Sequence, residues 1–261
     1  MENRVDFSLK RFASVVKIDL AEQKKGLIIT LSIILGIHFI IYMTSAFTGP
    51  GEEIHFIFFA NALFLAGLIA TSVVFRDFYA GDRAYFSLLL PASNFEKYVS
   101  KFLITTIGYV IGGIVIYFVY SSIVMGLAAA LFGSSYGVFN PFTAELWRMI
   151  GGYIVVHSIF FFGAVYFRKG AYLKTLLSMI IFAVVITIFA SLITALTAAT
   201  WIDDLIPFAM NGFQNFRIPD TNSVITFLSV MCAIARSFIY FILPPALWIT
   251  GFLRFKEIEV R

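Results

Sequence analysis

The sequence predicts an all-α membrane protein with six transmembrane helices and both termini in the cytoplasm. Of its 261 residues, 60% are hydrophobic and 13% are charged, about half the charged share of an ordinary soluble domain. Six apolar stretches are long enough to cross a bilayer as helices, and the basic residues gather in alternate connections between them. A water-soluble globule is excluded, because too few polar residues remain to cover its surface.

The N-terminal segment, residues 1–25, has the periodicity of an amphipathic helix. Its apolar positions recur at spacings of three and four residues: Val5, Leu9, Phe12, Val16 and Leu20. Lys10, Ser14 and Lys17 fall on the other side of such a helix. We expect this helix to lie in the interface of the membrane. A solvated helix that leads into the first span is the alternative.

The remaining residues, 26–261, are predicted to form the transmembrane domain. The six spans are expected at about 26–47, 54–75, 102–132, 149–167, 176–199 and 224–255. Each meets the roughly 20 helical residues that a bilayer core requires. Continuous apolar runs, in place of alternating polarity, argue against a membrane β-barrel. Pro244 and Pro245 remove backbone donors within the sixth run and predict a kink or a break there.

The distribution of basic residues predicts the orientation. Sixteen of the nineteen Lys and Arg residues fall in the N-terminal segment, the second connection, the fourth connection and the C-terminal tail. The first, third and fifth connections together contain only two basic residues, Arg148 and Arg217. Because basic connections stay in the cytoplasm, both termini are predicted to be cytoplasmic, in a cell inner or plasma membrane. The net charge of +4 therefore reflects topology and does not indicate a nucleic-acid partner.

The second connection, between spans two and three, is the longest on the cytoplasmic side. Pro91 disfavours helix at Leu90. Ser93 and Glu96 have the spacing of a capping box, which predicts that a new helix starts here and runs through Lys101 into the third span.

A glycine, a leucine-rich stretch, Pro-x-Ser-x-x-Glu and a lysine thus precede the third span. The residues of this pattern are Gly81, Leu88, Leu89, Leu90, Pro91, Ser93, Glu96 and Lys101. The pattern resembles that of permease subunits of type-2 ABC exporters, although Asn94 stands where that family often has a basic residue. The resemblance implies that the connection carries a coupling helix, which docks on a nucleotide-binding subunit. The residues expected at this contact are Arg76, Asp77, Tyr79, Gly81, Asp82, Arg83, Tyr85, Leu90 and Pro91.

The resemblance also implies a function. A permease of this kind forms the translocation path of an ATP-driven exporter as a homodimer or heterodimer, and separate ATPase subunits bind ATP and Mg²⁺. The sequence has no G-x-x-x-x-G-K-[ST] phosphate loop, so we expect no catalytic residues, cofactor, metal site or enzymatic activity in this chain. Cys232 is the only cysteine, which excludes an intrachain disulfide.

Two other functions are considered. An ATP-independent membrane anchor or sensor subunit could recruit cytoplasmic partners through the basic connections. Secondary transport is disfavoured, because no Asp or Glu falls inside a predicted span, and ion coupling usually needs a carboxylate near the membrane midplane. The substrate is left open.

Three polar residues within the spans are candidates for the pathway: Arg236, His38 and His157. Arg236 would contact an anionic group of a substrate, pair with a carbonyl or hydroxyl group, or extend to a lipid headgroup. For His38 and His157, hydrogen bonding inside the helix bundle is the alternative.

Small residues predict a close helix contact on the third span. Gly108 and Gly112 have GxxxG spacing and Gly113 follows, which would allow another helix of this chain, or of a second subunit, to approach closely. The fifth connection, residues 201–222, is too apolar for a solvated loop. The resemblance implies short helices here that dip back into the membrane, and an interfacial loop is the alternative.

Overall fold

The computed structural model is all-helical over the residues that it describes, which are 7–45, 53–79, 91–133, 137–211, 229–231 and 233–259. Within these residues, six helices are long and apolar enough to cross a membrane. The predicted all-α membrane architecture is confirmed to this extent. The chain divides into two compact units, Met1–Tyr172 with Tyr240–Arg261, and Leu173–Ile239.

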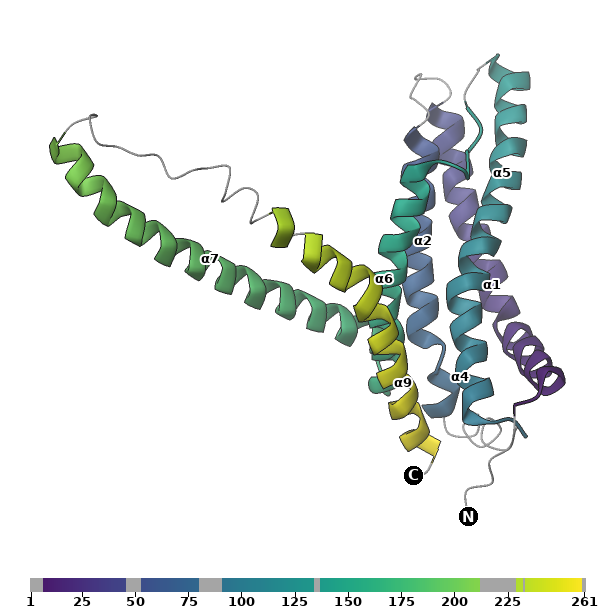
Figure 1. Ribbon diagram of the computed structural model, residues 1–261. Helices are drawn as coiled ribbons and strands as arrows, with labels where there is room; N and C mark the ends of the chain where they lie inside the picture. Colours follow the sequence, from purple (N-terminus) through teal and green to yellow (C-terminus); the bar gives the residue numbers. More distant parts are fainter. Residues whose placement is uncertain are drawn as a thin grey trace. The chain divides into compact units, whose positions relative to one another are not determined.

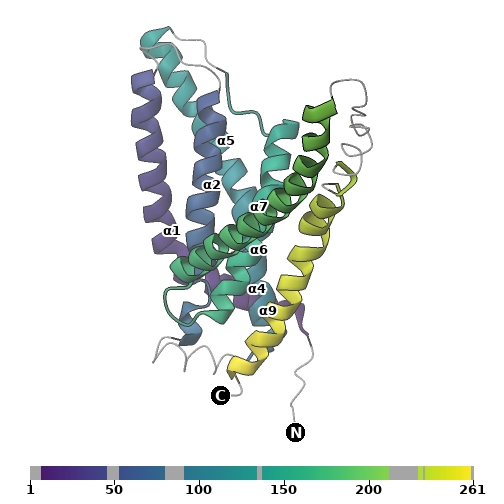
Figure 2. The same cartoon turned by 90° about the vertical axis from the view of Figure 1, so that its left-hand side faces the viewer.

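The first unit is a bundle of helices. Its α-helices are α1 (Leu9–Ser45), α2 (Glu53–Val73), α4 (Asn94–Leu103), α5 (Tyr109–Phe132), α6 (Ala144–Tyr166) and α9 (Leu243–Glu259). α6 packs along α2 and α9, and α1 contacts α4 and α2. Figures 1 and 2 show α1, α2, α5 and α6 extending in the same general direction. Side-chain contacts bring together the start of α1, the end of α2, the start of α4 and the end of α9. We call this region, in which α1 begins and α9 ends, the terminal end of the first unit.

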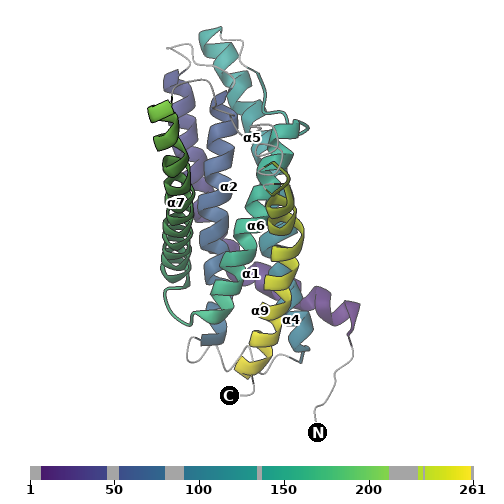
Figure 3. The same cartoon turned by 60° about the vertical axis from the view of Figure 1, so that its left-hand side comes forward.

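The predicted interfacial helix and first span are one helix. α1 is unbroken from Leu9 to Ser45, so the predicted boundary at residue 25 is not a helix end. At 1.5 Å per residue, these 37 residues extend over about 55 Å, which is well beyond a bilayer core of about 30 Å. Figure 3 shows that the first turns of α1 lie at an angle to the rest of the helix.

The capping box at the start of α4 is confirmed. The Ser93 hydroxyl accepts a hydrogen bond from the Glu96 amide at 3.2 Å, and the Ser93 amide donates to the Glu96 carboxylate at 2.8 Å. α4 then continues through a π-helical turn, η2 (Ile104–Gly108), into α5. Gly133 ends α5 in the left-handed conformation, with φ of 63°, which a glycine adopts without steric cost.

The π turn lies against α6. Its wide hydrogen-bond ring changes the register of the helix and leaves the Thr105 carbonyl able to accept from the Tyr153 hydroxyl, at 3.3 Å. Thr105 itself donates its hydroxyl to the Lys101 carbonyl at 2.9 Å. Of these two bonds, the one from Tyr153 joins the π turn to α6.

The second unit consists largely of α7 (Ala171–Asn211), which has 41 residues. The predicted short helices in the fifth connection are wrong for residues 201–211, because α7 continues through them as one helix. Residues 212–222 of that connection lie outside the described residues. The predicted break in the sixth span is not observed, because the described chain is helical without interruption from residue 233 to Glu259; a π-helical turn, η4 (Phe238–Ile242), directly precedes the helix that contains Pro244 and Pro245.

The glycines of the predicted GxxxG contact have no close neighbour from another helix of this chain among the described residues, and their contact with a second subunit stays a prediction. A Cβ atom added at Gly112 would have no neighbour within 4 Å in the described part of the chain, and at Gly113 only Phe59 would reach it, at 4.0 Å. At Gly108 the nearest atom would be the Leu103 carbonyl of its own helix, at 3.3 Å. The described residues therefore contain no close packing of a second helix on this motif.

Two other glycines do make room for side chains. A Cβ at Gly67 would lie 2.6 Å from both Tyr109 and Tyr153, and a Cβ at Gly251 would lie 2.7 Å from the Tyr98 hydroxyl. Tyrosine side chains from other helices contact both glycines. These contacts depend on the tertiary structure and not on GxxxG spacing.

Candidate functional site

The candidate site consists of the residues on either side of residues 80–90, at the terminal end of the first unit. We call residues 80–90 the 80–90 segment. The segment leaves α2 through a short 3₁₀ helix, η1 (Arg76–Tyr79), and the chain re-enters the described structure at Pro91. Five predicted contact residues lie outside the described residues: Gly81, Asp82, Arg83, Tyr85 and Leu90. Leu88 and Leu89 of the sequence pattern also lie there.

The residues before the segment pack in an aromatic cluster. We define the aromatic cluster by its buried members, Val74, Phe75, Tyr98, Phe161, Ala164, Val165 and Phe255. The Phe75 ring centroid lies 5.2 Å from that of Phe161 and 5.4 Å from that of Phe255. Phe78 adds an edge contact to Phe255 at 4.9 Å. Tyr79 donates its hydroxyl to the Val165 carbonyl. The start of the segment is thereby fixed to α6 and α9.

The residues after the segment join the same cluster. Tyr98 of α4 stacks on Phe75 at 5.8 Å and donates its hydroxyl to the Trp248 carbonyl of α9 at 2.7 Å. Phe95 contacts Phe252 edge-on at 5.8 Å. Both ends of the segment therefore rest on one packed cluster that includes α2, α4, α6 and α9.

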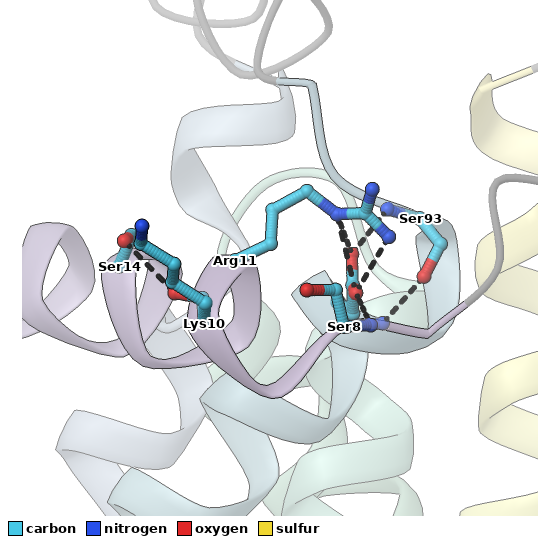
Figure 4. Close-up of polar contacts among 6 residues, drawn as sticks. Ser8, Lys10, Arg11, Ser14 and Ser93 are labelled. Atoms are coloured by element: carbon cyan, nitrogen blue, oxygen red, sulfur yellow. Dashed lines mark hydrogen bonds and ion pairs between the residues drawn. The ribbon is translucent and has the colours of Figure 1, made fainter.

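The first ionic tether joins the start of α1 to α4. Glu96 is fully buried, and its carboxylate accepts from Arg11 Nη2 at 3.0 Å, from Arg11 Nε at 3.1 Å and from the Ser8 amide at 2.8 Å. Figure 4 shows the Arg11 side chain near Ser8 and Ser93, with dashed lines for its hydrogen bonds. With the Ser93 amide, the acceptor positions of the carboxylate are well occupied, which is what a buried carboxylate requires.

The second ionic tether lies two turns further along α1. Asp19 accepts from Lys101 Nζ at 3.1 Å and from the Ser100 hydroxyl at 2.6 Å. The side chains of Lys101 and Asp19 are only 4% and 9% exposed. Lys101 Nζ also lies 5.4 Å from the centroid of the Phe78 ring, a cation–π distance. Lys101 thus connects α4 to α1 and to the 3₁₀ turn that starts the segment.

The four described residues predicted to contact an ATPase subunit differ in exposure. Arg76 and Pro91 are exposed, and Asp77 and Tyr79 are partly buried. The Tyr79 hydroxyl donates to the Val165 carbonyl of α6, and a contact of Tyr79 with an ATPase subunit stays a prediction. Glu96 and Lys101, which belong to the sequence pattern, are buried in the tethers. The pattern residues that the structure describes therefore position the segment.

The histidines of the spans lie apart from this site. His38 is fully buried between α1, α2 and α5, with Nε2 at 3.1 Å from the Tyr117 hydroxyl and Nδ1 at 3.3 Å from the Tyr120 hydroxyl. His55 Nδ1 lies 3.2 Å from the same Tyr117 hydroxyl. The interpretation of His38 as a hydrogen-bonded residue of the bundle is confirmed, with Tyr117 and Tyr120 as its partners, and His55, which shares the Tyr117 hydroxyl, was not predicted.

His157 is likewise buried, beside the π turn. Its Nε2 lies 3.1 Å from the Thr105 hydroxyl. Because Thr105 donates to the Lys101 carbonyl, we assign the proton of His157 to Nε2, so that the ring donates to Thr105. Arg236, in the second unit, is exposed, and no hydrogen bond or ion pair from it is found among the described residues.

The roles of Arg11 and Asp19 were not predicted from the sequence. The available signal was the order of their charges along α1, which is opposite to the order of charges along α4. On α1 a basic residue precedes an acidic one by eight positions, and on α4 the acidic Glu96 precedes the basic Lys101. Arg11, Val15 and Asp19 share one helix face by their spacing of four. An acidic residue in a basic, amphipathic segment indicates a partner, but its identity depends on the tertiary structure.

The described residues contain no group of three or more His, Cys, Asp or Glu side chains that could hold a metal ion. No protein-family model, curated protein or solved structure matches the chain.

Proposed function

We propose that the chain is the permease subunit of an ATP-driven ABC exporter, coupled through its 80–90 segment to a separate nucleotide-binding ATPase subunit. The chain works as a dimer with a second permease subunit, identical or different, and the translocation path forms between them. ATP and Mg²⁺ bind to the ATPase, and this chain performs no covalent chemistry. The terminal end of the first unit faces the cytoplasm of a cell inner or plasma membrane, in agreement with the distribution of basic residues.

One observation carries the proposal. Both ends of the 80–90 segment rest on the aromatic cluster, and the ionic tethers join α4 to the start of α1. Packed side chains resist compression, so a force on the segment is passed to the helices around it. A displacement of the segment by a docked ATPase would therefore reach α1, α2, α6 and α9 together. A connection that only joined two spans at the surface would not need the aromatic cluster and the ionic tethers.

The experiment changes the segment itself. Gly81→Trp adds a bulky side chain to the predicted docking surface, and Pro91→Ala relaxes the turn before α4. We expect each variant to retain the ATPase subunit at a level at least about tenfold lower than the unchanged chain, as loss of an interface hot spot does. The measurement is the ratio of ATPase to permease after purification in a gentle detergent.

Matched controls separate docking from folding. Gly81→Ser adds little volume, and Pro141→Ala removes a proline from the third connection. Both are expected to retain the ATPase within about twofold, and all four variants are expected to elute as the unchanged chain does. Retention of the partner by Gly81→Trp and Pro91→Ala at the unchanged level would overturn the proposal and favour an ATP-independent anchor or sensor subunit.

A further inference from the structure

The first turns of α1 present three different faces. Successive residues of an α-helix are rotated by about 100°. Arg11, Val15 and Asp19 recur every four residues and form the face that is turned to α4, where Val15 and Asp19 are buried and Arg11 holds Glu96. Because both ionic tethers act on this face, they fix the rotation of the helix about its own axis. The other two faces are consequently held outward.

The second face is apolar and open. Leu9, Ala13 and Leu20 lie within about 40° of one another around the axis. Leu9 is 75% exposed and Leu20 is 44% exposed, and Ala13 is exposed as well. Large apolar side chains in this row avoid water only if something apolar covers them. α1 continues directly into a span, which places these turns at the level where the hydrocarbon of the bilayer ends.

The third face is basic and borders the apolar one. Lys10, Lys17 and Lys24 follow each other at intervals of seven residues, so that they also lie within about 40° of one another, and their row is centred about 60° from the apolar row. All three are exposed. Among the residues that the structure describes, no ion pair is found for their ammonium groups. In Figure 4, Lys10 takes no part in the Arg11–Glu96 tether, and its carbonyl accepts from the Ser14 hydroxyl at 3.0 Å.

We infer that this basic row binds the headgroups of anionic phospholipids in the leaflet at the terminal end of the first unit. With the apolar row in the acyl chains, lysines about 60° around the helix reach the level of the phosphate groups. Three positive charges in one row favour a lipid of net negative charge over a zwitterionic one. An acidic soluble protein would match the lysines but would leave the adjacent apolar row without a hydrocarbon environment.

The test uses the full chain alone in a neutral detergent, so its outcome does not depend on an ATPase partner. The chain is titrated with phosphatidylglycerol or with phosphatidylcholine, and bound lipids are counted by native mass spectrometry. We expect the variant K10Q/K17Q/K24Q to bind phosphatidylglycerol at least about tenfold more weakly than the unchanged chain, because each lysine contributes to attraction toward anionic lipid. Its binding of phosphatidylcholine is expected to be unchanged.

The control variant K169Q/K174Q/K256Q removes the same charge from other exposed lysines. It is expected to bind phosphatidylglycerol within about twofold of the unchanged chain. Equal binding by K10Q/K17Q/K24Q and the unchanged chain would overturn the inference, and so would an equal loss in both triple variants. A loss of a co-purifying protein from K10Q/K17Q/K24Q, with lipid binding intact, would assign the row to a protein partner and also overturn it.

Discussion

Replacement of Lys101 by methionine is expected to lower the free energy of unfolding by about 3 kcal/mol, because it leaves the Asp19 carboxylate buried without its counter-charge. The two side chains are 4% and 9% exposed, so water cannot replace the lost ammonium group. Asp19 keeps the hydrogen bond from Ser100, which places the loss at the lower end of the range for broken buried pairs. The measurement is unfolding of the purified chain by a denaturing detergent.

The double variant D19N/K101M tests directly whether the two charges are coupled. It removes both charges, and the asparagine side chain introduced by D19N can still accept from Ser100, so the stability of the double variant is expected to lie within about 1 kcal/mol of the unchanged chain. Arg254→Met serves as the control, because the Arg254–Glu257 pair is exposed and a surface pair contributes at most about 1 kcal/mol. Additive losses in the double variant would contradict the assignment of Asp19 and Lys101 as a coupled pair.

Substitution of Gly67 by alanine is expected to destabilise the bundle by about 1–2 kcal/mol, although alanine is the better helix former. Its Cβ would lie 2.6 Å from Tyr109 and from Tyr153. Neither ring can withdraw freely, since Tyr109 donates to the Ala62 carbonyl at 3.0 Å and Tyr153 to the Thr105 carbonyl at 3.3 Å. Displacement would strain the contact of α2 with α5, the π turn and α6.

Gly112→Ala is the matched control. It makes the same chemical change in a helix, at a position with no neighbour within 4 Å in the described chain, so its stability is expected to be unchanged or higher by up to about 1 kcal/mol. The two variants are compared by their thermal unfolding midpoints in one detergent. Equal midpoints would contradict the packing described at Gly67.

Much of the architecture followed from the sequence because it depends on local properties. Apolar length alone predicted six spans, and six helices of the described chain meet that requirement. The capping box of Ser93 and Glu96 is a contact between near neighbours, so its spacing predicted the start of α4. The π turn at Phe238–Ile242 lies directly before Pro244, where a backbone donor is missing.

The contacts between helices were not predictable in the same way. Gly108 and Gly112 have the GxxxG pattern, yet the close contacts occur at Gly67 and Gly251, where tyrosines arrive from other helices. The π turn at Ile104–Gly108 has no pattern of its own, because it depends on the packing of Thr105 against His157 and Tyr153. Residues 201–211 were expected to form separate short helices, but apolar residues extend a helix equally well, and α7 continues to Asn211.

The position of the candidate site comes from the sequence pattern, and the structure adds the contacts around it. The unusual connection between spans two and three is where the aromatic cluster and both ionic tethers meet. Tyr98, Phe161 and Phe255 read as ordinary apolar positions of separate helices, and only the fold brings them together. Glu96 was identified as a helix cap, whereas its pairing with Arg11, 85 residues away, required the structure.

The most direct test of the proposed function is to isolate the chain from native membranes and identify what it retains. The membranes are treated with a reversible amine cross-linker before solubilisation in a gentle detergent, and proteins retained in stoichiometric amount are identified by mass spectrometry. The proposal predicts an ATPase subunit with a G-x-x-x-x-G-K-[ST] phosphate loop, present at one copy per permease chain. A chain recovered alone after cross-linking, or with a partner that has no phosphate loop, would contradict it.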